Sequence, residues 1–239
     1  NWSGKRKKAM NFQQEKYAGG AAGYDGRIRK LFPFYETIHA AINAALRVYL
    51  APESELLIVG AGTGAEILEL GKTNPGWRFL GVDPARAMLD LAKEKIEAAG
   101  LTDRVCLFNG FVGDLPIGKL CDGATSAMIM HFVPDGGGKI EFLRAIASHM
   151  KSGAPLVLMD ANGDLNAPES ELLIEAWKQQ QVLAGVKWDA VESGMKERVK
   201  AIHFVPPERI EQLLAEAGFH RIQRFFQNFM LSGWIAFKS

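Results

Sequence analysis

The amino-acid sequence predicts an α/β protein in which helices cover both faces of a mostly parallel sheet, a doubly wound arrangement. Short, almost wholly apolar segments alternate with amphipathic ones over residues 55–159. Apolar segments of this length are typical of strands that are buried on both faces. The last two predicted strands are joined by a link too short for a parallel crossover. We therefore expect the sheet to finish with an antiparallel hairpin.

Composition predicts one globular unit and excludes several classes of protein. The 239 residues are 48% hydrophobic, and 28 Lys and Arg nearly cancel 27 Asp and Glu. No global field draws such a chain to nucleic acid or to an anionic membrane. Cys106 and Cys121 provide neither a zinc spacing nor a disulfide framework. No apolar run approaches the roughly 20 residues of a membrane span. We expect a cytoplasmic protein with a small-molecule substrate and no metal.

Residues 1–50 are predicted to form an N-terminal helical arm or lid. The basic run at residues 5–8 is expected to be a solvated tail, and because the sequence begins with Asn, Met10 is a possible initiator and residues 1–9 need not be natural. Residues 35–50 carry an apolar stripe with helical spacing, which Pro52 ends. The stripe consists of Ile38, Ile42, Leu46 and Tyr49.

The next segments alternate between strand and helix. Strands are predicted at 56–59, 77–82, 105–108, 124–130 and 156–159, with helices around 67–70, from Asp83 onward and over 140–150. Asp83 is interpreted as the N-cap of its helix and Pro84 as the first helical residue.

The last third of the chain changes character. Helices are predicted at 169–182, 188–200 and 207–217, followed by strands at 221–226 and 230–237. We expect residues 161–207 to form an insert that covers the mouth of the site within the domain 51–239. Its aromatic and histidine side chains are Trp177, Trp188, His203 and Phe204. The hairpin offers an apolar edge for pairing between two copies, formed by Leu231, Trp234 and Ile235.

The glycine-rich segment after the first strand predicts a nucleotide-like ligand. Gly60-Ala61-Gly62-Thr63-Gly64-Ala65 fits both the G-x-G-x-x-A pattern of dinucleotide sites and the G-x-G-x-G pattern of S-adenosylmethionine sites. Glycines let the backbone approach such a ligand. Asp83, at the end of the second strand, is placed to accept hydrogen bonds from ribose hydroxyls. The alternative without a ligand is that the glycines only form a tight turn and Asp83 only caps a helix.

Three further features favour S-adenosylmethionine over a nicotinamide dinucleotide. Gly110-Phe111-Val112 follows the third strand, where an adenine would lie between Phe111 and Val112. The turn at residues 150–155 precedes the fifth strand. The closing hairpin is the third feature, because a typical nicotinamide-binding fold lacks it.

With these motifs in this order, residues 55–239 resemble the class I S-adenosylmethionine-dependent methyltransferases. The resemblance implies a Rossmann-like seven-stranded sheet whose last strand is antiparallel, and S-adenosylmethionine as cofactor. Phe111 departs from the acidic residue that the family often has there, and Ser152 and Ala154 depart from the usual Lys-Pro-Gly-Gly turn. The expected cofactor contacts are Gly60, Ala61, Gly62, Asp83, Pro84, Met88, Gly110, Phe111, Val112 and Met128.

The N-terminal arm resembles that of a subgroup that includes carboxy-S-adenosylmethionine synthases. Residues 24–29, Tyr-Asp-Gly-Arg-Ile-Arg, are followed by Pro33-Phe34-Tyr35. In that subgroup, aromatic and arginine side chains close over the cofactor, and an arginine can pair bidentately with a carboxylate. Arg29 and Tyr35 are therefore expected cofactor contacts, with ordinary helix packing as the alternative. Phe34 stands where the subgroup usually has Gly.

Methyl transfer from a sulfonium needs few catalytic side chains, because the donor is already activated. If the acceptor is a hydroxyl or an acid, a general base helps. His131 follows the fourth strand at the edge where ligands bind, so it is the candidate base, and Asp160 ends the fifth strand in a similar position. The alternative is that His131 only shapes the pocket. Two other functions stay open: a regulatory S-adenosylmethionine-binding protein without catalysis, and an NAD-dependent oxidoreductase.

Overall fold

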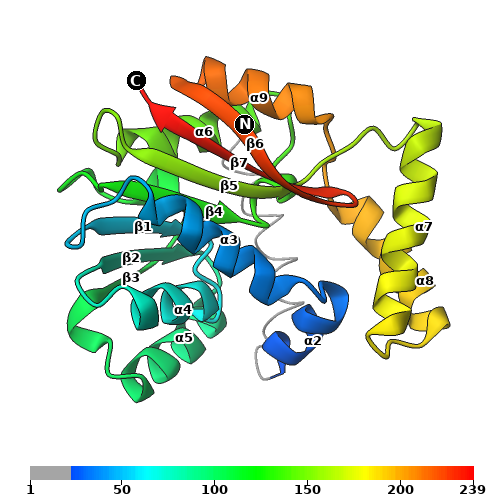
Figure 1. Cartoon of the computed structure of the whole chain (residues 1–239), viewed down its shortest axis with the longest axis horizontal. Coiled ribbons are helices and arrows are strands. Elements are labelled where there is room, and N and C mark those ends of the chain that lie inside the picture. The colour runs from blue at the N-terminus through cyan, green and yellow to red at the C-terminus, as the bar shows by residue number, and fades with distance from the viewer. Residues whose placement is uncertain (1–22) are drawn as a thin grey trace.

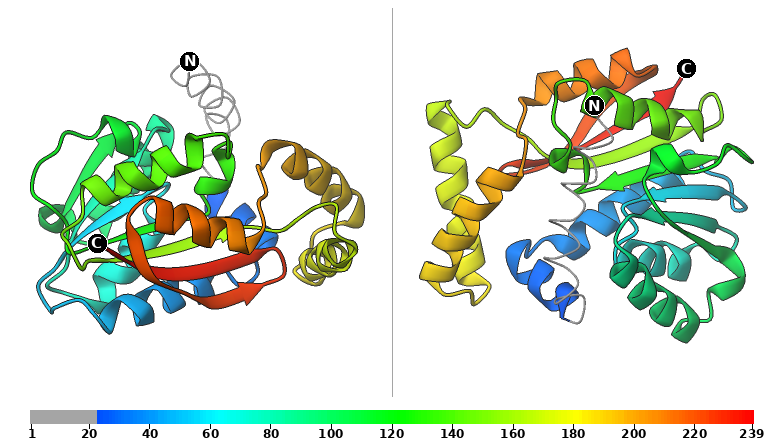
Figure 2. Two further views of the ribbon diagram at one scale, coloured as in Figure 1. Left: turned by 90° about the horizontal axis from the view of Figure 1, so that it is seen from above. Right: turned by 180° about the vertical axis from the view of Figure 1, so that it is seen from behind.

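The computed structural model describes residues 23–239, which form one seven-stranded sheet with helices on both faces (Figures 1 and 2). The basic run at residues 5–8 and Met10 lie outside the described residues. The strand order is β3-β2-β1-β4-β5-β7-β6. Within residues 23–239, no helix is long and apolar enough to cross a membrane.

The strands alternate with helices as the sequence predicts. The strands are β1 Glu55–Val59, β2 Arg78–Asp83, β3 Val105–Asn109, β4 Gly123–Ala127, β5 Pro155–Ala161, β6 Phe219–Asn228 and β7 Leu231–Lys238. The α-helices are α2 Tyr24–Leu31, α3 Tyr35–Arg47, α4 Ala65–Thr73, α5 Arg86–Ala98, α6 Gly138–Ser148, α7 Pro168–Leu183, α8 Trp188–Ala201 and α9 Pro207–Glu216. Three short 3₁₀ turns are η1 Thr102–Arg104, η2 Val112–Asp114 and η3 Met130–Phe132.

The predicted antiparallel hairpin is confirmed, but its place in the sheet differs from the expectation. β1 to β5 pair in parallel, whereas β7 pairs antiparallel with both β5 and β6. Because β7 lies inside the sheet, Leu231, Trp234 and Ile235 are buried and cannot form an edge that pairs with a second copy. The exposed edge on this side is β6.

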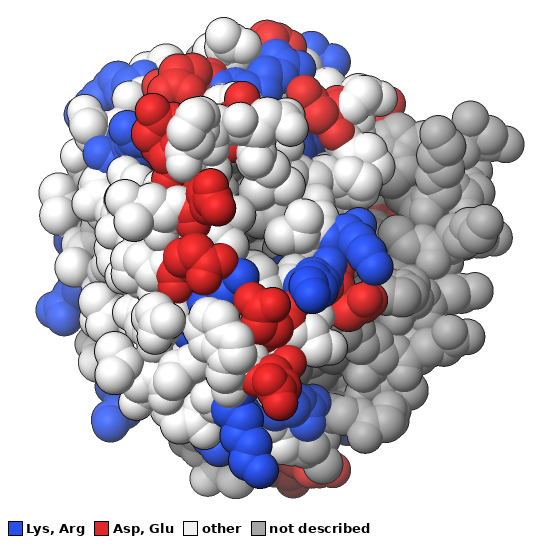
Figure 3. Space-filling view, turned by 90° about the vertical axis from the view of Figure 1, so that its right-hand side faces the viewer, with Lys and Arg blue, Asp and Glu red and all other residues white. Residues whose placement is uncertain are grey.

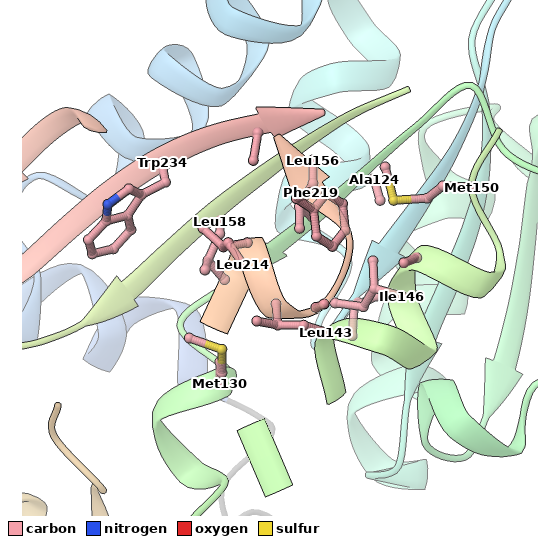
Figure 4. Packing of buried hydrophobic residues seen from close by; sticks show 14 of the residues in the cluster. Ala124, Met130, Leu143, Ile146, Met150, Leu156, Leu158, Leu214, Phe219 and Trp234 are labelled. Carbon is pink, nitrogen blue, oxygen red and sulfur yellow. The ribbon is translucent and has the colours of Figure 1, made fainter. Parts of the chain in front are cut away.

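Two hydrophobic clusters lie on opposite faces of the sheet. Under α6 and α9, Leu143, Ile146 and Leu214 face side chains of β5 and β7 (Figure 4). On the other face, α3, α4 and α5 cover the central strands, and the predicted stripe of α3 is buried there through Ile38 and Ile42. Both faces of the parallel strands are therefore covered, as their apolar sequences require.

A third apolar cluster joins the N-terminal arm to the insert. The helices α7 and α8 stand apart from the sheet on the side of α2 (Figure 1). Buried side chains of the segment from α2 to α3, of α7, of α8 and of the β6–β7 turn pack against one another. We call this set the arm cluster. Its buried members are Ile28, Phe32, Tyr35, Trp177, Met195 and Met230.

Several predicted element boundaries are wrong by a few residues, and two of them bear on the site. α3 ends at Arg47 and leaves Tyr49 half-exposed. α5 begins at Arg86 with Ala85 as its N-cap, because the Asp83 carboxylate accepts the amides of Gly62 and Ala85. β4 ends at Ala127, since Met128 adopts a φ of 59° that a strand cannot continue.

Candidate functional site

The glycine-rich loop lies at the carboxyl end of β1, between β1 and α4. Its three glycines all have positive φ, at 84° for Gly60, 53° for Gly62 and 80° for Gly64. A Cβ at Gly60 would lie 2.2 Å from the Ile129 side chain, whereas one at Gly62 would meet no heavy atom nearer than 3.9 Å. The loop is therefore packed at Gly60 and open at Gly62, where a ligand can approach the backbone.

Asp83 ties this loop to the end of β2. Its Oδ2 accepts a hydrogen bond from the Gly62 amide at 2.9 Å, and its Oδ1 accepts one from the Ala85 amide at 2.8 Å. Burial raises the pKa of Asp83, against the lowering effect of these two bonds. Each oxygen keeps a second lone pair. The carboxylate could therefore accept hydrogen bonds from a diol at the open side of the loop.

The turn after β3 is anchored to the same position. The Gly110 amide donates to the Asp83 carbonyl oxygen at 3.1 Å. The Asn109 side chain donates to the carbonyls of Asp83 and Pro84. Sequence reasoning did not identify Asn109, although an amide directly after a strand is a common anchor for a neighbouring turn.

The predicted adenine contacts occupy this edge with different degrees of burial. Val112 and Met88 are buried, and Phe111 is partly buried. Ala61 is buried within the loop, and Met128 follows β4 with its strained positive φ. Strained backbone of this kind is common at functional sites. The expected contacts from four separate segments are thus brought to one edge of the sheet.

The arm reaches the glycine-rich loop through Asp25, a residue to which the sequence assigned no role. Thr63 of the loop donates to Asp25 Oδ1 at 2.6 Å, and Lys95 of α5 donates to Asp25 Oδ2. Burial raises the pKa of Asp25, but the hydrogen bonds from Lys95 and Thr63 outweigh it and lower the pKa. Asp25 therefore latches α2 onto the loop.

The two predicted arm residues lie close to each other. The Arg29 guanidinium pairs with Glu36 and lies 5.8 Å from the centre of the Tyr35 ring. Tyr35 is buried in the arm cluster, 4.5 Å from the His39 ring, and burial strongly raises the pKa of its hydroxyl.

His131 and Asp160 form a buried pair at the carboxyl ends of β4 and β5. The Nδ1 atom of His131 lies 2.7 Å from Asp160 Oδ1, which also accepts a hydrogen bond from the His131 backbone amide at 3.1 Å. The two residues are 4% and 0% exposed. A carboxylate on Nδ1 fixes the orientation and tautomer of the ring and leaves Nε2 as the proton acceptor.

A buried lysine that the sequence analysis missed lies beside this pair. Lys139, in the first turn of α6, is 0% exposed and donates through Nζ to the Met130 carbonyl oxygen at 2.9 Å. Met130 immediately precedes His131 in η3. Burial lowers the pKa of Lys139, while the charges of Asp160 and Asp135 raise it.

A second buried carboxyl that the sequence analysis missed lies on the opposite face. Glu66, in the first turn of α4, accepts a hydrogen bond from the Thr125 hydroxyl. Burial raises the pKa of Glu66 to about 7, against the lowering effect of that bond. Among residues 23–239, no cluster of three or more His, Cys, Asp or Glu could hold a metal ion.

Comparison with known proteins finds a methyltransferase domain in this chain. Residues 57–156 match the family model described as a methyltransferase domain. A carboxy-S-adenosyl-L-methionine synthase of Hydrogenovibrio crunogenus is 27% identical over 58% of this chain, and a demethylmenaquinone methyltransferase of Symbiobacterium thermophilum is 24% identical over 77%. The matches span 49% and 75% of those proteins, respectively.

A solved structure has the same fold over nearly its whole length. It is a protein of Methanococcus maripaludis described as a putative S-adenosyl-L-methionine-dependent methyltransferase. The TM-score is 0.62 at 22% sequence identity, and the superposition covers 92% of this chain and 93% of that one.

The methyltransferase-domain match and these relatives support a class I S-adenosylmethionine-dependent methyltransferase, and the solved structure has the corresponding fold. Residues 57–156 form the methyltransferase domain, which holds the loop, Asp83 and the Gly110 turn. Its cofactor is S-adenosylmethionine.

Proposed function

We propose that the protein transfers a methyl group from S-adenosylmethionine to a hydroxyl or acid group of a small, largely apolar acceptor, with His131 as general base. The observation that carries this proposal is the buried His131–Asp160 pair at the carboxyl edge of the sheet. Methyl transfer from a sulfonium to a hydroxyl releases a proton, and an oriented imidazole can accept it.

The residues at the loop fit the cofactor. The free space beside Gly62 leaves the backbone accessible, and the Asp83 carboxylate lies directly next to it, as a ribose diol requires. Phe111, Val112 and Met88 supply apolar surface for the adenine. When bound, S-adenosylmethionine supplies an electrophilic methyl group that needs no further activation.

The protein's own contribution is to hold and move one proton. Asp160 accepts from His131 at Nδ1, so Nε2 carries the free lone pair. His131 Nε2 takes the proton of the acceptor, and the carboxylate of Asp160 stabilises the imidazolium that forms. The turn is fixed in place because the His131 carbonyl accepts the His203 amide at 2.7 Å.

The arm cluster favours an apolar or aromatic acceptor. It brings Phe32, Trp177 and Met230 together with Met128, which directly follows β4. Pockets for small molecules are commonly lined in this way. On the side of the α7–α8 insert, acidic and basic side chains are interspersed (Figure 3), so no single-sign field on that face favours a polyanionic acceptor.

We also propose that the protein acts in the cytoplasm, in a reducing compartment. The two cysteines support this, because Cys106 is an exposed free thiol and Cys121 a buried one.

A second candidate function is synthesis of carboxy-S-adenosylmethionine. Two observations favour it: the relative of that name in Hydrogenovibrio crunogenus, and the sequence of the arm around Arg29 and Tyr35. Such a synthase would act on S-adenosylmethionine itself: the sulfonium methyl group would lose a proton to a base and gain a carboxyl group from a carboxylic acid that serves as carboxyl donor.

The test starts with calorimetric titration of S-adenosylmethionine, S-adenosylhomocysteine and NADH into the wild type and Asp83→Ala. We expect micromolar binding of the first two, weakened about tenfold or more in the variant, or about 1.4 kcal/mol. Binding of NADH alone would contradict the cofactor assignment. Asp90→Asn, an exposed carboxyl on α5, is the matched control.

The second step separates the two activities by mass spectrometry. The enzyme is incubated with S-adenosylmethionine and a panel of phenols, alcohols and carboxylic acids. Methylated acceptor together with S-adenosylhomocysteine supports methyl transfer. A carboxylated nucleoside supports the second candidate. S-adenosylmethionine binding without either product across the panel would support the regulatory alternative.

A further inference from the structure

The helix α7 carries apolar side chains on two opposite faces. Its inner face holds Trp177 in the arm cluster, and Ser170 and Gln181 are buried on the same face. On the outer face, Leu172 and Leu183 are 72% and 88% exposed. At 3.6 residues per turn, these two leucines point in nearly the same direction, away from Trp177. A helix that is apolar on both faces ordinarily has a packing partner on each of them.

The outer face of α7 has the spacing of a seam between two helices. Its positions are separated by alternating steps of three and four residues, which is the repeat of helices that pack along each other. Between the two leucines the seam carries only Ala176 and Gln179, so it holds no charge over about 16 Å, the rise of eleven residues. The outer seam consists of Glu169, Leu172, Ala176, Gln179 and Leu183.

The two ends of the outer seam carry opposite charges. Glu169 begins it, and Lys187 follows its last leucine by four residues. Both are exposed, and neither forms an ion pair with another of the residues 23–239. Glu175, beside the seam, is instead paired with Lys178. In an antiparallel pair of identical helices, the N-terminal end of each copy lies beside the C-terminal end of the other. The outer seam is therefore complementary to itself in charge as well as in apolar spacing.

We propose that the outer seam of α7 binds a second copy of this chain, in an antiparallel contact about a two-fold axis. With the axis midway between Ala176 and Gln179, Leu172 of one copy lies opposite Leu183 of the other, because both leucines are equally far from the axis. Ala176 then faces Gln179, and its small side chain lets the helices approach closely at the crossing. A single pair of helices buries less than the roughly 1,200 Å² of a standard interface, so the dimer is expected to be weak.

The test is sedimentation equilibrium of the full chain at about 5 to 500 micromolar, with a Kd expected within this range. Reducing agent keeps the exposed Cys106 from linking two copies. Leu172→Glu and Leu183→Glu are each expected to raise the Kd about tenfold or more, since every substitution acts twice in a symmetric contact. The matched control is Val48→Glu at the end of α3, because Val48 is also 72% exposed. Its Kd should equal that of the wild type.

An exchange of charges tests the antiparallel register. Glu169→Lys is expected to raise the Kd about threefold, within the range of exposed ion pairs. The double variant Glu169→Lys with Lys187→Glu should restore the wild-type Kd, because the two charges only change places. Failure of this restoration would overturn the antiparallel contact.

Two other outcomes would overturn the proposal as a whole. One is a chain that stays monomeric at about 500 micromolar. The other is a dimer that neither leucine variant weakens, which would place the contact on another face of the molecule. The measurement needs neither cofactor nor acceptor, so its result is independent of the proposed methyl transfer.

Discussion

Two buried carboxyl groups on opposite faces of the same sheet have different partners. Asp160, beneath the α6 and α9 side, is paired with the imidazole of His131, and its charge raises the pKa of Lys139. Glu66, on the α3 and α4 side, receives one hydroxyl hydrogen bond from Thr125. Among residues 23–239 no cation lowers the pKa of Glu66, so burial raises it to about 7. Burial without a charged partner leaves a carboxyl half protonated near neutrality. A partner that can carry charge is what prepares a carboxyl for proton transfer.

Asp25 lies between these two cases. It combines one hydroxyl partner, Thr63, with one cationic partner, Lys95, and it is only partly buried. Burial raises the pKa of Asp25, but the hydrogen bonds from Lys95 and Thr63 and the charges of Lys95 and Arg29 together lower it. Lighter burial and cationic neighbours thus separate Asp25 from Glu66.

The largest effect is expected in catalysis, through the His131–Asp160 pair. If neither residue contributes to catalysis, Asp160 and Glu66 do not differ in function. We expect His131→Gln to lower kcat by roughly 10²- to 10⁴-fold on the acceptor found by the panel, the range typical of a lost general base. Asp160→Asn should also lower kcat, because an amide can donate to Nδ1 and favour the wrong tautomer. The measurement is single-turnover kinetics, with S-adenosylmethionine affinity measured alongside.

Affinity for S-adenosylmethionine should stay within about twofold in both variants, since all of the expected cofactor contacts except Met128 lie on other segments; a twofold change is about 0.4 kcal/mol. If kcat is retained in both variants, His131 only shapes the pocket. Gln181→Ala in α7, a buried residue outside the pair, serves as a control for general loosening of the fold.

The Glu66 side sharpens the comparison through stability. Its folded pKa lies above its unfolded value near 4.5, so the stabilisation is complete below pH 4.5 and is lost as the pH rises to about 7. Glu66→Gln should therefore match the wild type below pH 4.5 and exceed it at pH 8 by up to about 3 kcal/mol. Urea unfolding between about pH 4 and pH 8 measures this difference.

His39 opposes this trend in the wild type. Burial lowers the pKa of His39 to about 4, so its contribution to stability grows as the pH rises from 4 to 6.5. Because His39 is present in both proteins, its effect cancels in the difference between Glu66→Gln and the wild type. Glu69→Gln, an exposed position on α4, is the matched control. A pH-independent difference for Glu66→Gln would show that Thr125 compensates the buried charge.

Local sequence patterns were sufficient to predict most of the fold. Apolar runs and helical spacing predicted all seven strands and the helices of the insert. A strand buried on both faces has a continuous apolar run, whereas a helix buried on one face has apolar residues every three or four positions. The two wrong boundaries that bear on the site, at the start of α5 and the end of β4, fall where other segments contact the backbone. The amides that hold Asp83 and the strained turn at Met128 depend on contacts between segments that no local pattern contains.

The site was predictable only in the parts that follow strands. The glycine-rich loop, Asp83 and His131 lie at or shortly after the carboxyl end of a strand, so a parallel sheet brings them to one edge. Lys139 and Glu66 sit in the first turns of amphipathic helices, where charged residues are ordinarily solvated. Their burial depends on how α6 and α4 pack onto the sheet, and no local sequence pattern predicts that packing.

The smallest effect is expected at the Asp25 latch. Asp25→Asn keeps a group that can bond to Thr63 but loses the charge that pairs with Lys95, a partly buried ion pair for which we expect about 1 kcal/mol or less. Backbone amides of α2 should therefore exchange with solvent up to about fivefold faster. Because the pKa of Asp25 is lowered in the folded protein, the wild-type contact between Asp25 and Lys95 stabilises α2 above about pH 4. This stabilisation is lost as the pH falls further. Hydrogen exchange of α2 amides measures both effects.

Arg86→Gln, which removes an exposed ion pair on α5, should leave α2 exchange unchanged. If S-adenosylmethionine affinity falls in parallel with the faster exchange of Asp25→Asn, α2 is the part of the arm that closes over the glycine-rich loop. Faster exchange at constant affinity would instead make Asp25 a structural fastening, and would restrict the charged-partner argument to the Asp160 side of the sheet.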